Sequence, residues 1–121
     1  IALKILTVSP SNAVFGALHW CVNKNYTLID LFGCDFDIWK HLYVDQNNLS
    51  LNLKFEHFYK TEFEPVYTNK IHHTSQKIED ELRKWRSFFI YMNGMSEIAK
   101  SKNINIRNFS PTSMVQCFEK C

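Results

Sequence analysis

The sequence lacks the short patterns that identify most enzymes and membrane proteins. It contains no glycine-rich phosphate loop, no nucleophile elbow, no Cys-x-x-Cys pair and no His-Glu-x-x-His frame. The longest apolar block, Phe88 to Met92, is far too short to cross a bilayer, so we expect no transmembrane segment. Only three Gly and three Pro are present, which favours regular helices and strands over a loop-rich scaffold.

A stretch of charge of one sign is also missing. The net charge is +2, and the densest basic cluster is interleaved with acidic residues on one segment: Lys77, Glu79, Asp80, Glu81, Arg83, Lys84 and Arg86. Mixed signs at this spacing are typical of a solvated helix face rather than of a stripe that follows phosphates. We therefore expect no nucleic-acid partner.

The chain does contain enough apolar material for a core. Its 121 residues are 45% hydrophobic and include ten Phe, five Tyr and three Trp. Because this is close to the commonest size of one domain, we expect a single compact domain over residues 1–121. Each aromatic side chain can bury a large area, so a stable core is within reach at this length.

Four cysteines, an even number, predict disulfide bonds in an extracellular protein, with free thiols in the cytosol as the alternative. Cys117 and Cys121 lie four residues apart on a predicted helix, which is poor geometry for a bridge between them. We therefore predict that each pairs with one of Cys21 and Cys34. A zinc site is the other possibility, but it needs two close pairs of cysteines, and Cys21 and Cys34 are too far apart.

Glycosylation sequons also favour export. Asn25-Tyr-Thr and Asn48-Leu-Ser are candidate acceptor sites, whereas a third sequon at Asn108 is followed by Pro111, which disfavours its use. No basic start followed by a continuous apolar stretch is visible, so we expect that, if the protein is exported, its leader peptide has already been removed. The prediction is a secreted glycoprotein.

Hydrophobic spacing predicts alternating strands and helices. The strongest pattern is a helix near residues 75–100, and in the clearest strand, Leu49 to Glu56, apolar and polar residues alternate strictly. Pro65 confines a further strand to a sheet edge. In chain order we expect a strand at 2–8, a helix at 13–24, a strand at 27–32, a short helix at 35–44, strands at 49–56 and 62–67, the long helix, a strand at 104–109 and a final helix at 111–121.

This order favours an α/β fold, with about four strands in a mixed sheet covered by helices. The polar face of the strand at 49–56 indicates the alternative, an α+β arrangement with an exposed sheet. On the long helix, residues spaced by four and three form one apolar stripe, which we expect to be buried against the sheet face that carries Leu51, Leu53 and Phe55: Ile78, Leu82, Trp85, Phe89 and Met92.

Asp35 and Asp37 form the sharpest local signal. Asp35-Phe-Asp37 follows an apolar strand, so both carboxylates come at the carboxyl end of that strand. The pair resembles the Asp-x-Asp motif of glycosyltransferases, which implies a divalent ion held on a nucleotide-sugar diphosphate. The structural alternative makes Asp35 the N-cap of a short helix and places Asp37 in its first turn.

A second resemblance concerns Leu3 to Pro10, a stretch similar to the opening strand of family-1 UDP-sugar transferases. The Gly-His-x-Val-Thr second strand of that family is absent, and 121 residues hold no donor-binding half. The resemblance therefore implies a relic or fragment of that fold.

We interpret the chain as a secreted, disulfide-stabilised, non-enzymatic binding protein, an extracellular ligand, inhibitor or effector. Its expected partner is an extracellular protein or a cell-surface receptor, and a variant of this hypothesis is an apolar small molecule held among the many Phe side chains. The alternative function is an enzyme or enzyme remnant of the nucleotide-sugar glycosyltransferase type that uses Asp35 and Asp37. We expect these two residues to be structural, with no functional metal and no cofactor.

Overall fold

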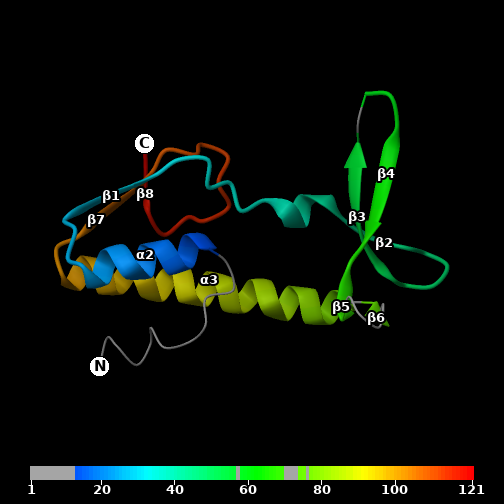
Figure 1. The fold of residues 1–121 in the computed structure, drawn as a ribbon, viewed down its shortest axis with the longest axis horizontal. Coiled ribbons are helices and arrows are strands. Elements are labelled where there is room, and N and C mark those ends of the chain that lie inside the picture. Colours follow the sequence, from blue (N-terminus) through cyan, green and yellow to red (C-terminus); the bar gives the residue numbers. More distant parts are fainter. Residues whose placement is uncertain (1–12, 57, 70–73, 76) are drawn as a thin grey trace. The chain divides into compact units, whose positions relative to one another are not determined.

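The computed structural model of the chain describes residues 13–56, 58–69, 74–75 and 77–121, and the strand predicted at 2–8 lies outside them. The fold is mixed α/β, which confirms the predicted class (Figure 1). Residue contacts divide the chain into two units. The first comprises the described residues up to Phe36 together with Ser87–Cys121, and the second is Asp37–Arg86. The single domain expected over residues 1–121 stays a prediction.

The first unit contains a parallel sheet. Its three strands are, in spatial order, β1 (Leu28–Leu31), β7 (Asn105–Asn108) and β8 (Glu119–Lys120). Ile29 and Leu31 of β1 are buried, and so are the β7 residues opposite them in register, Ile106 and Asn108. One face of the sheet is therefore the covered face.

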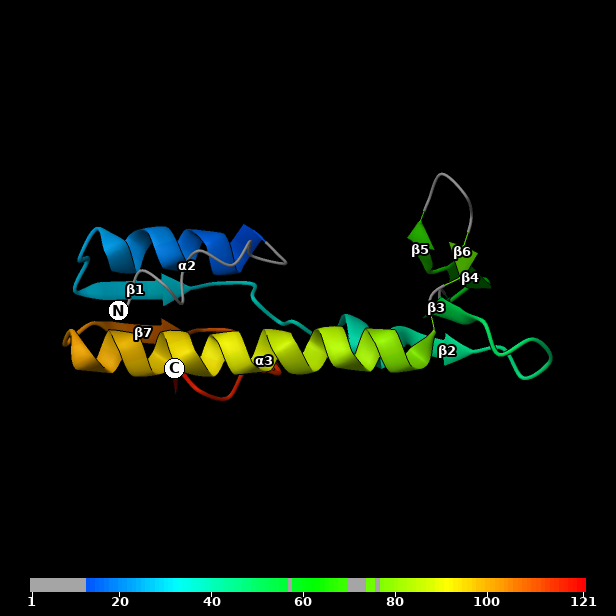
Figure 2. The ribbon, with the colours of Figure 1, turned by 90° about the horizontal axis from the view of Figure 1, so that it is seen from below.

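Two helices cover this face. They are α2 (Ala13–Asn23) and the part of α3 (Ile78–Ser101) that begins at Ser87, and Figures 1 and 2 agree that both lie on the same side of β1 and β7. Each helix is followed by an asparagine in the left-handed region, Asn25 with φ 58° and Asn103 with φ 55°. Asparagine tolerates this conformation better than other residues with a side chain, so it takes the place of the scarce glycine where a helix ends.

The core of the first unit lies between these helices and the sheet. Its buried apolar side chains come from both helices, from two strands and from the C-terminal segment: Phe15, Leu18, Val22, Ile29, Leu31, Phe88, Met92, Met95, Ala99, Ile104, Ile106, Val115 and Phe118. The predicted stripe on the long helix is wrong at its start, because Ile78 and Leu82 are exposed. The buried stripe instead runs through Phe88, Met92, Met95 and Ala99.

The second unit contains an antiparallel sheet. Its three strands are, in spatial order, β2 (Leu42–Val44), β3 (Leu51–Glu56) and β4 (Thr61–Pro65). β4 ends this order, which confirms that the strand with Pro65 lies at a sheet edge. A separate pair of short antiparallel strands follows, β5 (Tyr67–Asn69) and β6 (Thr74–Ser75).

Two predicted helices differ in the structure. Within residues 35–44 only Ile38–His41 is helical, as one turn of 3₁₀ helix, and β2 follows directly. The final helix expected at 111–121 is absent, since this segment is irregular as far as β8. β8 pairs with β7 in parallel, with Arg107 opposite Glu119 and Asn108 opposite Lys120. This distant pairing outweighs the local helical spacing.

Candidate functional site

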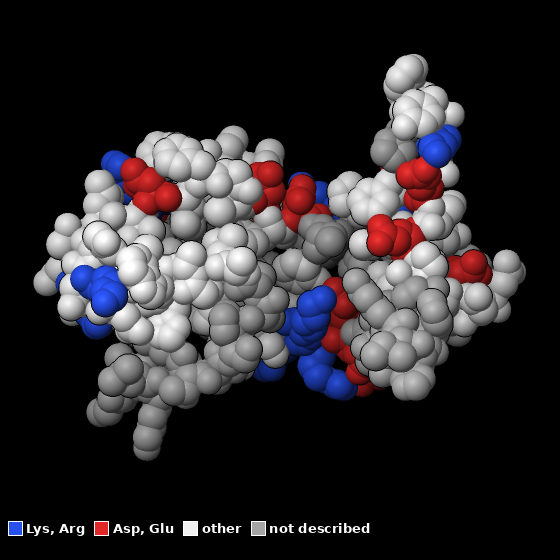
Figure 3. All heavy atoms as spheres, viewed as in Figure 1, with Lys and Arg blue, Asp and Glu red and all other residues white. Residues whose placement is uncertain are grey.

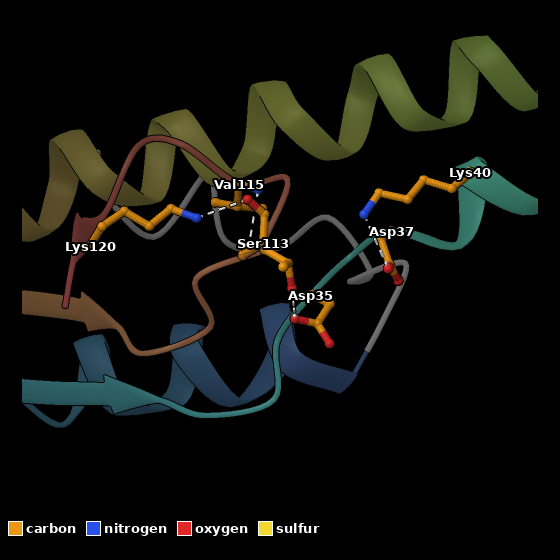
Figure 4. Close-up of polar contacts among 7 residues, drawn as sticks. Asp35, Asp37, Lys40, Ser113, Val115 and Lys120 are labelled. Carbon is orange, nitrogen blue, oxygen red and sulfur yellow. Dashed lines mark hydrogen bonds and ion pairs between the residues drawn. The ribbon is translucent and has the colours of Figure 1, made fainter.

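The two carboxylates of the Asp-x-Asp motif have separate partners (Figure 4). The hydroxyl of Thr112 donates to Asp35 Oδ1 at 3.0 Å, and Asp37 Oδ2 lies 3.5 Å from Lys40 Nζ. Asp35 belongs to the first unit and Asp37 to the second. Asp37 directly precedes the 3₁₀ turn, and its carbonyl accepts the Lys40 N–H at 2.9 Å, so Asp37 rather than Asp35 is at the start of the helical turn.

A polar network closes the carboxyl end of the parallel sheet. The Ser110 hydroxyl accepts the Cys34 N–H at 2.7 Å. Lys120 Nζ donates to the Ser113 carbonyl at 2.8 Å (Figure 4). Asn108 accepts the Ser110 N–H at 3.0 Å through Oδ1. Every one of these contacts is made within the chain, so the network explains how the loops after β1 and β7 are held together. Among the described side chains, no three His, Cys, Asp or Glu residues converge as metal ligands.

The opposite face of the parallel sheet carries an ion pair and an aromatic pair. Arg107 binds Asp30 through two hydrogen bonds of 2.7 Å each, and this pairing holds the pKa of the Asp30 carboxyl below its usual value. Next to it, the rings of Phe32 and Phe109 stack with centroids 4.8 Å apart, and the Arg107 guanidinium lies over Phe109. These groups satisfy one another across β1 and β7.

The four cysteines are unpaired in this structure. Cys21 and Cys34 line the same cavity, whereas the Cys117 thiol donates to the Met92 carbonyl at 3.5 Å and Cys121 is exposed. Burial raises the pKa of the Cys117 thiol, and burial together with the charge of Asp35 raises that of Cys34. Because Cys117 and Cys121 flank β8 rather than sharing a helix, the argument from helical spacing no longer applies. Disulfide formation by the four residues stays a prediction.

Both expected glycosylation acceptors are exposed. Asn25 follows α2, and Asn48 lies in the turn between β2 and β3, where its side chain accepts the Ser50 N–H at 3.0 Å. Asn108, at the sequon that we set aside, is fully buried. The positions of Asn25 and Asn48 are accessible to a modifying enzyme, and glycosylation at them stays a prediction.

A cavity of about 280 Å³ lies between α2 and β1 in the first unit. Apolar side chains form most of its wall, with the two thiols and Asp30 at its border: Val14, Ala17, Leu18, Cys21, Ile29, Asp30, Leu31, Phe32 and Cys34. A cavity of about 150 Å³ already holds benzene in an engineered protein, so this one has room for a somewhat larger apolar molecule.

The β3–β4 hairpin exposes three aromatic side chains. Phe58 is fully exposed, Tyr59 is 68% exposed and Phe63 is 51% exposed. Phe58 and Tyr59 pack edge to face at the hairpin tip with centroids 5.6 Å apart, and Phe63 packs against Tyr43 at 5.0 Å. Figure 3 shows uncharged atoms at the tip, with charged side chains of both signs below them. The local signal for this exposure was the position of Phe58 and Tyr59 between two strands, where a turn is expected.

Few of the described apolar side chains of the second unit are fully buried. Among the described side chains of Asp37–Arg86, Leu51 is the one apolar residue that is fully buried. The other buried side chain there is Glu81, whose carboxylate accepts the Trp85 indole N–H at 2.9 Å and lies 3.2 Å from Lys84 Nζ. Clustered exposed apolar side chains, such as the aromatic rings of the hairpin, are a feature of surfaces that another molecule covers.

Basic residues near the start of α3 are neutralised by their acidic neighbours. Arg83 lies 2.7 Å from Glu79 and 3.3 Å from Asp80, and Lys84 pairs with Glu81. This geometry fits the solvated helix face that the mixed charge pattern predicts.

No protein family matches this chain, and no curated protein or solved structure shows significant similarity to it. None of the helices within the described ranges combines the length and the apolar character needed to span a membrane.

Proposed function

We propose that this chain is a secreted, non-enzymatic binding protein that contacts a protein partner through the tip of the β3–β4 hairpin. The observation that carries the proposal is the exposure of Phe58 and Tyr59 in a unit with one fully buried apolar side chain among those described. The partner is an extracellular protein or a cell-surface receptor. The exposed acceptors Asn25 and Asn48 and the even cysteine count support the extracellular setting.

The physical basis is the free energy of covering aromatic surface. Large aromatic side chains are enriched among the residues that contribute most to protein–protein binding, because each brings much area with few rotatable bonds. Folding does not bury the side chain of Phe58, which stays fully exposed, so its transfer into an apolar pocket of a partner would contribute about 1.5–3 kcal/mol. A hairpin is suited to this role because the strands hold the tip in one orientation.

The test is site-specific photocrosslinking. A benzophenone amino acid replaces Phe58 in the full chain, which is then irradiated with intact cells of the source organism and their medium. We expect a discrete adduct that excess unlabelled wild-type protein suppresses and that excess Phe58→Ser/Tyr59→Ser protein does not.

The matched control carries the same benzophenone residue at Ile90, which is 49% exposed on α3 in the first unit. Adducts of equal yield and identity from both positions, or equal competition by the two unlabelled proteins, would contradict the proposal. The double serine variant should keep the wild-type free energy of unfolding, because the two side chains that it removes are largely exposed.

An apolar small molecule is a second candidate ligand, and the cavity between α2 and β1 favours it. We expect a compound of one or two fused rings, such as indole, to raise the melting temperature of the wild-type protein by mass action. Ala17→Trp, which fills the cavity from α2, should abolish this shift. A shift that persists in the filled variant would place the ligand elsewhere.

A further inference from the structure

Within the described residues, no strand pairs with the outer edge of β4. β4 ends the order β2-β3-β4, and all five of its residues, Thr61–Pro65, are exposed. In an antiparallel ladder, alternate residues of an edge strand point their N–H and C=O groups away from the one neighbouring strand. Because Pro65 has no N–H, an added strand takes its hydrogen bonds from the N–H groups of residues 61–64 and from the carbonyls of β4, the arrangement known as β-augmentation.

The side chains of β4 give this edge a pattern. Residues opposite each other in a sheet share a face, so Glu62 and Glu64 lie on the face of Phe55 and Leu53, and Phe63 lies on the other face with Lys54. Glu62 already pairs with Lys60, and no described residue forms an ion pair with Glu64. An added strand would thus meet two carboxylates on one face and an aromatic ring on the other.

This pattern disfavours a second copy of the chain as the occupant. In the antiparallel register that pairs all five residues of two β4 strands, Phe63 lies opposite Phe63 and each Glu62 lies opposite a Glu64. Like charges directly opposite each other destabilise a strand pair, whereas opposite charges stabilise it. A strand with basic residues at alternate positions removes this conflict.

We propose that the edge of β4 binds an extended segment of a partner protein in which Lys or Arg alternates with apolar residues. The basic side chains pair with Glu62 and Glu64, and the apolar residues between them lie beside Phe63. This inference rests on the proposed function, because it assigns the chemical class of the partner whose pocket receives the hairpin tip. The backbone of the segment supplies the hydrogen bonds and its charges select the register.

The test uses synthetic peptides with the full-length protein. The probe is a nine-residue peptide in which lysine alternates with valine, and binding is followed through the backbone amide resonances of residues 61–64, since Pro65 has no N–H. We expect saturable shifts at β4, a dissociation constant below about 1 mM, and weakening as salt is raised. Glu62→Lys/Glu64→Lys should lower the affinity about tenfold or more, and this variant should instead bind a peptide with glutamate in place of lysine.

Two controls separate strand addition from general attraction of charge. Glu79→Lys/Glu97→Lys makes the same change in net charge on the exposed surface of α3 and should leave the affinity unchanged. N-methylation of the alternate peptide amides that face β4 should abolish binding, whereas methylation of the intervening amides should not. Equal binding of both methylated peptides, or of a peptide with its lysines clustered, would overturn the inference.

The remaining outcomes distinguish the inference from the proposed function. If crosslinking at Phe58 is specific but no peptide binds more tightly than about 1 mM, the basic strand is wrong and the hairpin-tip function stands. If the wild-type protein forms a dimer that perturbs the amides of residues 61–64, the occupant is a second copy and the inference is wrong. If the peptide binds as expected but crosslinking at Phe58 is unspecific, the edge of β4 is a site independent of the tip.

Discussion

Replacing Phe88 with alanine tests where the core of the first unit lies. Phe88 is 3% exposed, and its ring packs against those of Phe36 and Phe89 with centroids 5.2 Å and 5.4 Å away. Transfer of a buried phenylalanine to water accounts for about 1.5–3 kcal/mol, and the cavity left behind raises the total to about 3–5 kcal/mol. The higher helix propensity of alanine offsets about 0.5 kcal/mol of this loss.

The assay is urea unfolding followed by circular dichroism, in reductant so that the state of the thiols is the same in every variant. Ile90→Ala is the matched control on the same helix, and we expect it to change the free energy of unfolding by less than about 1 kcal/mol because Ile90 is 49% exposed. A loss below about 1 kcal/mol for Phe88→Ala, or equal losses for the two variants, would refute the assignment of the buried face.

Three further predictions concern titration and metal binding. Because Arg107 depresses the pKa of Asp30, the stability that this carboxylate contributes is present above its unfolded pKa and is lost as the pH falls through the folded value. Asp30→Asn should therefore flatten the loss of stability below about pH 4. The same loss of stability with falling pH in the variant and the wild type would contradict this. In the reduced protein at neutral pH, iodoacetamide should modify the exposed Cys121 well before Cys117, because burial raises the pKa of the Cys117 thiol. Equal rates of modification at the two thiols, measured by mass spectrometry, would contradict this prediction. Millimolar manganese with nucleotide-sugars should leave the melting temperature unchanged, whereas a rise that disappears in Asp37→Asn would support the transferase alternative.

The candidate interaction surface could be predicted only in part. Pro65 correctly predicted that its strand lies at a sheet edge, because proline has no N–H to donate and therefore disfavours a strand that is paired on both sides. The exposure of Phe58 had a local signal in its place between two strands, but that of Phe63, inside β4, could not be predicted, since a large aromatic residue is far more often buried.

The sequence by itself determined the elements whose signal is local. The helices at 13–23 and 78–101 and the strand at 51–56 follow from periodicity, which the chain expresses within a few turns or pleats. The α/β class follows from the order of these elements.

Only the tertiary structure decided which helix face is buried and how the C-terminal segment folds. Phe88 and Phe89 both offer an aromatic ring, and Phe88 takes the buried position because Phe36, far away in the sequence, packs against it. In the same way, the spacing of Met114, Cys117 and Phe118 suits a helix, but pairing of β8 with β7 draws the end of this segment into the parallel sheet. Packing contacts and ladder hydrogen bonds join residues that are distant in the chain. A local sequence pattern therefore does not predict which of these contacts form or how much they stabilise the fold.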